Sequence, residues 1–327
     1  MGVINGLPNL QEQLLERRRR LDVPGLAGRD EVHALIHDVD AALERLEAGN
    51  YGLCEECDDP IRPERLLADP LTRFCLGCLS PEQARALERD LQLASTVQAA
   101  LLPAADVDID GYSLHYEYRP LGPVSGDHCD VLSPAAVGQP WHFVLGDVSG
   151  KGVAASILMS HLHAIFRSLV PLQLPLAEVV RHANRLFTES TLPSSHATLV
   201  AGRLDASGAL EICNAGHCPA LLVRAGRVTR LNGSGFPLGF FSASTFETHR
   251  VQLEAGDLLF LYTDGFSESC NDEGEQYSPE RIGRLLRGVN GETPDTVVRA
   301  CLEDLDDFRG GTPREDDLTL MAIRRNG

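Results

Sequence analysis

Residues 142–152, HFVLGDVSGKG, combine an apolar strand pattern with a glycine-rich acidic turn and decide the fold prediction. The run His142–Val148 is typical of a buried strand. Asp147 stands near its end, beside a glycine that permits close backbone approach. A phosphate-binding Walker A loop needs four residues between its first glycine and Gly-Lys, followed by Ser or Thr. Here only three residues intervene and Gly152 follows Lys151, so the stretch is not a nucleotide-binding loop.

Three further carboxylates stand at strand ends or tight turns. They are Asp127 in SGDHCD, Asp264 in YTDGFSE and Asp316 in REDDLTL. Clustered aspartate oxygens suit a hard cation such as Mg²⁺ or Mn²⁺. Two such ions about 3.5–4 Å apart can activate a water for in-line attack on phosphorus. One Asp-Gly pair alone predicts only a turn, but four carboxylates in this context predict a two-metal hydrolytic site.

Strand and helix patterns surround these turns and predict an α+β layered sandwich. Strands are expected at Tyr112–Arg119, His142–Val148, Ala197–Asp205, Ala209–Asn214, Ala220–Arg224, Leu258–Thr263 and Leu318–Arg324. Helices are expected at Val153–Val170, Leu176–Glu189, Ser278–Leu286 and Pro294–Phe308.

Seven or more motifs follow one another in a fixed order over about residues 84–326. They are Leu101-Leu102-Pro103, Ser125-Gly126-Asp127, Gly146 to Gly152, Ala197-Thr198-Leu199, Asn214-Ala215-Gly216-His217, Pro237-Leu238-Gly239, Thr263-Asp264-Gly265-Phe266-x-Glu268 and Asp316-Asp317-Leu318-Thr319. In this order they resemble the SpoIIE/RsbU branch of the PPM (type 2C-like) serine/threonine phosphatases. The resemblance implies a four-layer α-β-β-α sandwich with the metals at one sheet edge.

The resemblance also implies roles for single residues. Asp147 is expected to bridge two Mn²⁺ or Mg²⁺ ions, with the Val148 carbonyl as a further ligand. Asp264 and Asp316 complete the site, and Asp127 serves the second ion. Two further residues are expected to support the site. Asp317 is expected to hold the ligands from outside the coordination sphere. His217 is expected to shape a turn rather than act as a general acid.

The same resemblance implies a phosphoprotein phosphatase. Water activated at the metals attacks phosphoserine or phosphothreonine, with no covalent enzyme intermediate. In this branch the substrate is commonly a phosphorylated anti-sigma-factor antagonist with a STAS-type domain, in a bacterial signalling pathway.

Four of the nine cysteines form two C-x2-C pairs, Cys54/Cys57 and Cys75/Cys78, with seventeen residues between them. Two such turns at this spacing can close a thiolate cage on one Zn²⁺. Four protein ligands leave no open position, so the sequence predicts a structural zinc site.

The stretch around these cysteines, about residues 30–80, resembles the DksA/TraR type of zinc finger. Besides the cysteines, the resemblance rests on Ala42–Leu46, Gly49, Tyr51, Gly52, Ile61, Arg65, Leu66, Ala68 and Pro70. Members of that family often insert a long helical hairpin into RNA polymerase. Here the predicted hairpin, residues 10–21 and 30–48, is short. We therefore expect residues 1–80 to form a helical hairpin plus zinc finger.

Residues 81–103 are predicted to form a linker helix before a phosphatase domain at 104–327. Apolar residues recur in heptad fashion at Ala84, Leu87, Leu91, Ala94, Gln98 and Leu101, with one polar position. The seam predicts either packing onto its own domain or a parallel homodimer through residues 84–101. Relatives usually carry a sensor before such a helix, so the zinc finger is expected to regulate the phosphatase.

Composition limits the other function classes. The chain has 327 residues, 43% of them apolar, and a net charge of −18. The negative charge argues against DNA binding, which needs a basic surface. We expect no membrane span, since no apolar run approaches about 18 residues, and no secretory signal. An odd cysteine count then indicates the reducing cytoplasm. The rival hypothesis is a transcription-associated module that docks on RNA polymerase through the finger.

Overall fold

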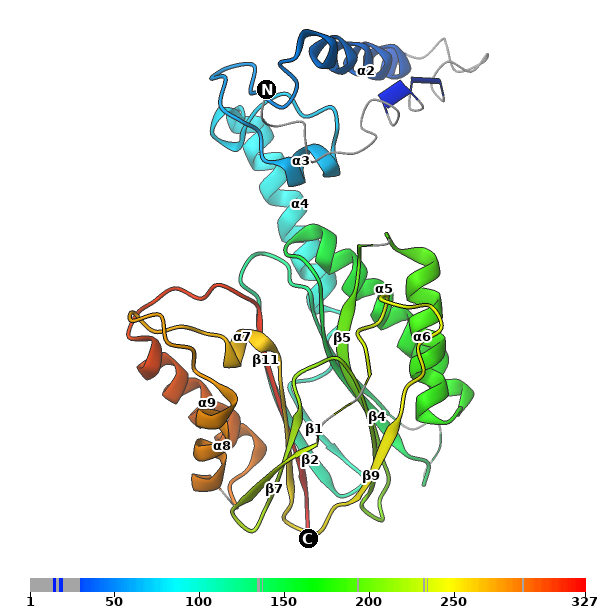
Figure 1. Ribbon diagram of the computed structural model, residues 1–327, viewed down its shortest axis with the longest axis vertical. Helices are drawn as coiled ribbons and strands as arrows, with labels where there is room; N and C mark the ends of the chain where they lie inside the picture. The colour runs from blue at the N-terminus through cyan, green and yellow to red at the C-terminus, as the bar shows by residue number, and fades with distance from the viewer. Residues whose placement is uncertain are drawn as a thin grey trace. The chain divides into compact units, whose positions relative to one another are not determined.

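The computed structural model describes residues 14, 15, 18, 19, 30–133, 136, 138–192, 194–231, 233, 235–289 and 291–327. The chain divides into two compact units, Met1–Asp90 and Leu91–Gly327, and each is described by itself (Figure 1). The division falls within helix α4, Pro81–Ala99.

The first unit is a small helical and loop structure around its cysteines. Helix α2 spans Asp30–Ala48, and Gly49, with φ of 75°, ends it. Short helices α3, Pro63–Ala68, and η2, Leu76–Cys78, follow. The small core consists of Leu14, Val39, Ala42, Tyr51, Cys54, Ile61 and Leu66. Most of the predicted first helix, residues 10–21, lies outside the described residues.

The second unit contains two antiparallel sheets. One has the strand order β1-β2-β11-β10-β7-β8 and the other β3-β4-β5-β6-β9. The strands are β1 Asp106–Ile109, β2 Tyr112–Arg119, β3 Asp127–Leu132, β4 Trp141–Val148, β5 Ala197–Leu204, β6 Ala209–Ala215, β7 Ala220–Arg224, β8 Arg227–Leu231, β9 Thr248–Gln252, β10 Leu258–Tyr262 and β11 Leu318–Arg325.

Helices cover the outer face of each sheet, which confirms the predicted four-layer sandwich (Figure 1). Helices α5, Val153–Leu169, and α6, Leu176–Ser190, cover the five-stranded sheet, with η3, Val170–Leu172, between them. Helices α8, Pro279–Gly288, and α9, Pro294–Arg309, cover the six-stranded sheet. The short α7, Asp264–Ser267, follows β10.

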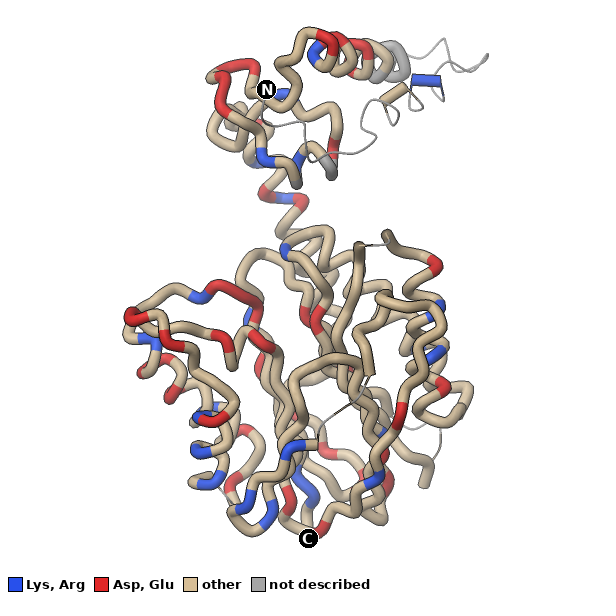
Figure 2. Tube along the Cα trace, in the orientation of Figure 1, with Lys and Arg blue, Asp and Glu red and all other residues tan. Residues whose placement is uncertain are grey.

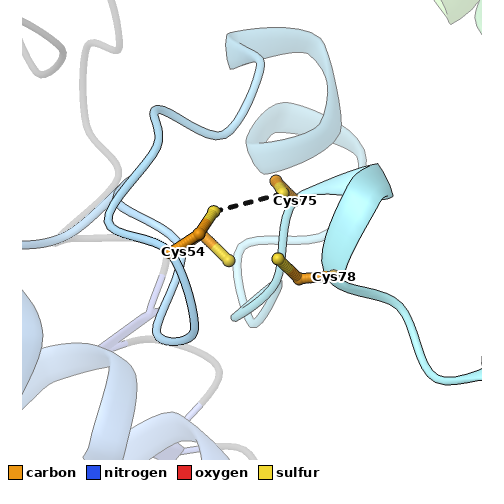
Figure 3. Close-up of side chains that lie close together, drawn as sticks. Cys54, Cys75 and Cys78 are labelled. Carbon is orange, nitrogen blue, oxygen red and sulfur yellow. Dashed lines mark hydrogen bonds between the residues drawn. The ribbon is translucent and has the colours of Figure 1, made fainter.

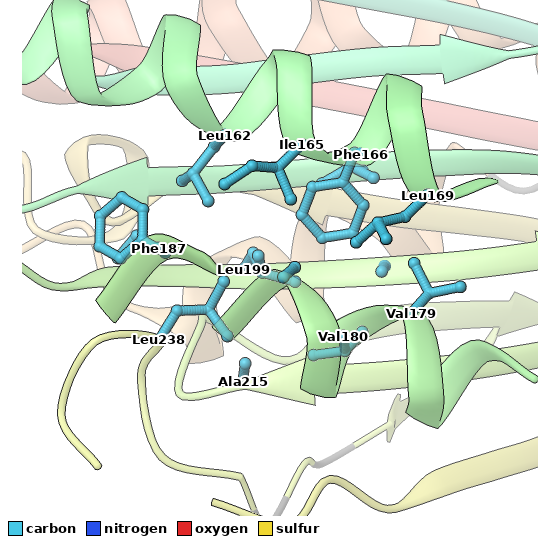
Figure 4. Close-up of a cluster of buried hydrophobic side chains, with 14 of the residues drawn as sticks. Leu162, Ile165, Phe166, Leu169, Val179, Val180, Phe187, Leu199, Ala215 and Leu238 are labelled. Atoms are coloured by element: carbon cyan, nitrogen blue, oxygen red, sulfur yellow. The ribbon is translucent and has the colours of Figure 1, made fainter. Parts of the chain in front are cut away.

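Three hydrophobic clusters fill the spaces between the layers. In the first, Leu162 and Phe166 of α5 meet Phe187 of α6 and Leu199 of β5 (Figure 4). The second lies between the sheets and includes Trp141, and the third lies under α8 and α9. Because both faces of the central strands are covered, their side chains are buried on both sides.

Alternation along β3 assigns its side chains to opposite faces. Cys129 and Val131 join the cluster between the sheets, whereas Leu132 joins the cluster under α5. Asp127 therefore shares the inter-sheet face, and His128 and Asp130 share the face toward α5.

The heptad pattern of helix α4 left two alternatives open, packing onto its own domain or a homodimer, and the contacts of Gln98 bear on them. Within the second unit, Gln98 is buried, donates to the Ser125 carbonyl at 2.7 Å and accepts from the Ser125 N–H at 2.9 Å. The end of the predicted seam thus packs onto its own unit. The most exposed large apolar side chains of the helix are Leu93 and Val97, which lie outside the predicted seam.

The expectation that no segment is long and apolar enough for a membrane span needs correction. Val153–Leu172 passes that test of length and composition. Seven residues of α5, among them Met159, Leu162 and Phe166, are buried. The apolar character of the segment is accounted for by its place in the core of the sandwich.

Candidate metal centres and active site

The four paired cysteines of the first unit converge. Their sulfur atoms all lie within 4.8 Å of one another, and those of Cys54, Cys75 and Cys78 point toward a common centre (Figure 3). The sulfurs of Cys57 and Cys75 are 3.7 Å apart. A tetrahedral site with Zn–S bonds of about 2.3 Å has an edge of about 3.8 Å, whereas a disulfide would need about 2.05 Å. The four side chains therefore fit one Zn²⁺.

Backbone and side-chain contacts hold the two cysteine turns together. The Glu55 N–H donates to the Arg73 carbonyl at 3.0 Å, and Arg73 Nε donates to the Glu55 carboxylate at 2.9 Å. Burial raises the pKa of Cys54, but backbone N–H groups, first that of Cys75, outweigh it and lower the pKa to about 6. A thiolate is the form that binds zinc.

We predict that Cys78→Ser weakens zinc binding strongly, because three thiolates cannot close the cage. The variant should lose its zinc to a chelator concentration that the wild-type protein withstands, measured by metal analysis after dialysis. Protease cleavage between residues 51 and 78 should rise in parallel. Cys270→Ser, in a loop of the second unit, serves as the matched control, and equal zinc retention in both variants would contradict the site.

The second unit brings the predicted acidic residues to one end of the sandwich. Asp127 pairs with Asp147 across β3 and β4 of the five-stranded sheet. Asp264 directly follows Thr263 at the end of β10, and Asp316 precedes β11, both belonging to the six-stranded sheet. The ends of four strands from two sheets therefore supply the four carboxylates.

Asp127 links the two sheets. Its Oδ2 accepts hydrogen bonds from the Thr263 hydroxyl, at 3.0 Å, and from the Thr319 hydroxyl. Its backbone N–H donates to Ser125 Oγ at 3.0 Å. Burial, followed by the charge of Asp147, raises the pKa of Asp127 well above its ordinary value. These threonines were missed from the sequence, although both lie inside the quoted motifs.

The carboxylates repel one another. Burial and then the charges of Asp264 and Asp316 raise the pKa of Asp147 to about 7. Burial and then Asp316 raise the pKa of Asp264 as well. Lys151, whose Nζ lies 3.0 Å from Asp316 Oδ2, is a nearby positive charge. A cation bound among these oxygens would remove the repulsion, so the donor set fits Mg²⁺ or Mn²⁺.

Two glycines allow the backbone to approach this centre. A Cβ on Gly126 would lie 2.9 Å from the Val148 carbonyl oxygen and 3.5 Å from Asp147 Oδ1. A Cβ on Gly265 would lie 1.9 Å from the Asp317 carbonyl oxygen. The close packing gives a physical reason for the glycine in the SGD and TDG motifs.

Asp317 and His217, for which the sequence predicts supporting roles, both hold nearby backbone in place. Asp317 accepts the N–H groups of Leu121 at 2.6 Å and Gly126 at 3.0 Å, and so holds the segment before Asp127. The His217 N–H donates to Asn214 Oδ1 at 2.8 Å in a turn. Burial lowers the pKa of His217 to about 4, so its imidazole is neutral and does not suit a general acid at neutral pH.

The acidic centre is wider than the cysteine centre. Among the residues that the structure describes, two sets of at least three ligands have all their ligand atoms within 4.8 Å of one another: the four cysteines, and a second set of His128, Asp130 and His163. The four aspartates do not form such a set. The sequence did not point to the second set, because His163 lies on α5, far along the chain from β3.

We predict that the acidic centre destabilises the protein as pH rises when no divalent metal is added. In the folded state Asp147 keeps its proton up to about pH 7, whereas the unfolded chain releases it near pH 4. Stability is therefore lost as pH rises through this window. The free energy of unfolding of Asp147→Asn, relative to wild type, should increase between pH 4 and 7 by on the order of a few kcal/mol.

Urea unfolding at several pH values measures this difference. Asp272→Asn, at an exposed position, is the matched control and should track the wild type. A constant difference between Asp147→Asn and wild type across the window would contradict the repulsion.

Sequence comparisons identify relatives of both units. The family described as "Stage II sporulation protein E (SpoIIE)" matches residues 138–326, and the prokaryotic dksA/traR C4-type zinc finger matches residues 49–84. The chain is 25% identical to protein IcfG of Synechocystis over 268 residues, which are 72% of this chain and 42% of IcfG. It is 22% identical to the phosphoserine phosphatase RsbU of Bacillus subtilis, over 73% of this chain and 71% of RsbU. A stretch of 45 residues, 14% of the chain, is 49% identical to the RNA polymerase-binding transcription factor DksA of Caulobacter vibrioides, of which it covers 32%.

Solved structures support the fold. The SiaA-PP2C domain of Pseudomonas aeruginosa is similar with a TM-score of 0.64 and 20% identity, covering 74% of this chain and 98% of that domain. The RsbU and RsbW domains of Rv1364c from Mycobacterium tuberculosis are similar with a TM-score of 0.58 and 30% identity, over 69% of this chain and 62% of that one.

Proposed function

Because the chain belongs to the SpoIIE family of PP2C-type phosphatases, we propose that it is a metal-dependent protein serine/threonine phosphatase. The observation that carries the proposal is the convergence of Asp127, Asp147, Asp264 and Asp316 at one end of the sandwich. Phosphatases of this family use divalent metals. We propose two ions, Mg²⁺ or Mn²⁺, held by these carboxylates and the Val148 carbonyl.

When bound, such ions supply an activated water and neutralise charge on the phosphoryl group. The protein positions the ligands: Asp127 is fixed by two threonine hydroxyls, and Asp317 fixes the segment before it. A pocket of about 200 Å³ opens beside Asp264 and Asp316 and is also lined by Lys151 and Arg314. These two cations suit a phosphoryl group approaching the acidic centre.

We propose that the substrate is a protein that carries phosphoserine or phosphothreonine, and specifically a STAS-type antagonist of an anti-sigma factor. The similarity to the phosphoserine phosphatase RsbU supports this substrate class. The proposed location is the cytoplasm, because the five cysteines outside the proposed zinc site suit a reducing environment.

An aromatic surface beside the acidic centre supports a protein substrate. Phe236, Phe240 and Phe241 are 59%, 52% and 55% exposed and contact one another. The Phe240 ring lies 5.0 Å from that of His196. The Ser149 N–H donates to the His196 carbonyl at 2.9 Å, two residues from Asp147. Exposed aromatic side chains next to a catalytic loop are suited to binding another protein.

We propose that the zinc finger regulates the phosphatase. The finger stands before the phosphatase fold, with α4 between them in sequence. Exposed Leu93 and Val97 on α4 offer an apolar stripe for a homodimer. The zinc-site variant Cys78→Ser tests this regulation without removing any part of the chain.

A second candidate is docking on RNA polymerase through the finger. The observation that favours it is the similarity to DksA, which is confined to 45 residues. The test is a pull-down in which the immobilised protein is mixed with RNA polymerase. Binding of polymerase by the wild-type protein, and its loss in Cys78→Ser, would support this function. If neither protein binds polymerase, this second candidate is wrong and the phosphatase proposal is unaffected.

We predict that Asp147→Asn and Asp264→Asn each reduce phosphate release to the level of the protein-free control. Each removes a carboxylate from the proposed metal centre, so metal binding and charge balance fail together. The assay is phosphate release from a phosphoserine protein with added Mn²⁺. Asp272→Asn should keep wild-type activity. Equal activity of Asp147→Asn and wild type would overturn the two-metal site.

The aromatic surface leads to a separate prediction. Phe240→Ser should raise KM for a phosphoprotein by about tenfold, as expected for loss of a well-placed aromatic contact at a protein interface. It should leave hydrolysis of p-nitrophenyl phosphate unchanged, because that ester needs no docking surface. An equal loss of activity on both substrates would show that Phe240 supports the fold instead of docking the phosphoprotein.

A further inference from the structure

Strand β3 and helix α5 face each other with a polar group of residues that the proposed reaction does not use. His128 and Asp130 alternate onto the helix-facing side of β3, and His163 and Arg167 are four residues apart on α5, on one side of the helix. His128 and Asp130 are 1% and 0% exposed, and the His163 side chain is 12% exposed. The group is thus enclosed on the strand side and reachable from the helix side.

The spacing of the three possible ligands matches a metal site better than a hydrogen bond. The ligand atoms of His128, Asp130 and His163 all lie within 4.8 Å of one another. His163 Nδ1 lies 3.4 Å from Asp130 Oδ2, which is long for a hydrogen bond between charged or neutral partners. A tetrahedral ion with bonds of about 2.0–2.1 Å has ligand edges of about 3.3–3.4 Å.

His128 gives an independent reason to expect a ligand. Neither of its ring nitrogens has a hydrogen-bond partner, although the side chain is buried. A buried polar group without a partner is uncommon and calls for an unseen ion or water. The His128 ring meets the His163 ring edge-on, with centroids 5.8 Å apart.

Asp130 has capacity left for one more bond on the side of His163. Its Oδ1 accepts the Val131 N–H at 2.8 Å and an Arg167 N–H at 2.6 Å. Its Oδ2 accepts Arg167 Nε at 2.8 Å. Each carboxylate oxygen offers about two lone pairs, so Oδ2 retains one, and His163 Nδ1 lies near this oxygen.

We propose that His128, Asp130 and His163 bind one borderline transition-metal ion, Zn²⁺ or Ni²⁺, with solvent completing the coordination on the side of His163. Two imidazoles and one carboxylate are the ligands that these ions prefer, in contrast to the all-oxygen set of the acidic centre. The two sites lie on opposite faces of β3, since Asp127 faces the space between the sheets.

Arg167 sets the strength of this site. Its guanidinium already neutralises Asp130 and would repel a divalent ion, so the wild-type affinity is moderate. Occupancy would join β3 to α5. Helix α5 begins directly after Lys151 and Gly152, so the ion would also stiffen the attachment of the loop that carries Asp147.

The test uses the full chain with zinc in the cysteine site and excess Mg²⁺ to occupy the acidic centre. Ni²⁺ is titrated in by calorimetry, and zinc content is measured afterwards. The wild-type protein should bind one Ni²⁺, and His163→Gln should bind it at least about 10-fold more weakly. His161→Gln, two residues away on the same helix, is the matched control and should behave as wild type. Equal Ni²⁺ affinity in His163→Gln and wild type would overturn the site.

Two further variants keep the result independent of folding and of the proposed phosphatase. Arg167→Gln should bind Ni²⁺ more tightly than wild type, because it removes a competing positive charge; weaker binding would overturn the proposal. Asp264→Asn should retain the Ni²⁺ site even where phosphatase activity is lost, and loss of Ni²⁺ there would assign the ion to the acidic centre. Co²⁺ bound in place of Ni²⁺ should show visible d–d absorption without added sulfur-to-metal charge-transfer bands, which would appear if the cysteines were the ligands.

Discussion

Repulsion between carboxylates that the fold forces together is the constraint on which the second unit depends. Asp127 and Asp147 are direct neighbours across β3 and β4. Burial and then the charge of Asp147 raise the pKa of Asp127, and burial and then the charges of Asp264 and Asp316 raise the pKa of Asp147. Strand β4 is paired on both sides, with β3 and with β5, so the two carboxylates cannot relieve their repulsion by moving apart. The energy must be recovered by hydrogen bonds to the carboxylates and by a positive charge in their midst.

The compensating contacts also join the two sheets. Thr263 directly follows β10 and Thr319 lies on β11, both strands of the six-stranded sheet, yet both hydroxyls donate to Asp127 on the five-stranded sheet. The Thr319 N–H in turn donates to the Thr263 hydroxyl at 2.9 Å. The apolar cluster between the sheets sets their separation, and this polar link sets the alignment of their ends. The geometry of the acidic centre therefore depends on how the two sheets pack against each other.

Much of this arrangement could be predicted from the sequence, because its residues lie at strand ends and in the turns beside them, where short motifs mark them. Asp147 and Asp264 stand beside glycines that the close packing requires, so each motif carries its own structural reason. The central strands were also predictable, since apolar runs buried on both faces leave a clear pattern. The edge strands β1, β8 and β9 were missed because they alternate weakly between exposed and half-buried residues.

The parts that were missed depend on contacts between distant segments. Strand β3, DHCDVL, does not have the composition of a strand, although all six residues are buried. Its polar residues are tolerated because partners come from elsewhere: threonines for Asp127 and Arg167 for Asp130. The heptad pattern of α4 likewise could not show that Gln98 is used by the Ser125 backbone rather than by a second helix. A periodic pattern identifies a face of a helix, and only the fold decides what covers it.

The chemistry of the ligand sets separates the metals that the chain can hold. Four thiolates in the first unit favour a soft or borderline ion, and four carboxylates in the second favour a hard one. Mg²⁺ binds thiolates poorly, so the cysteine site is closed to the ion of the acidic centre, whereas zinc also binds carboxylates and is kept from them by its low availability. A change in zinc availability would therefore act first on the cysteine site, where four thiolates favour this ion. Under the proposed regulation, the finger would respond to one metal while the phosphatase reaction depends on another.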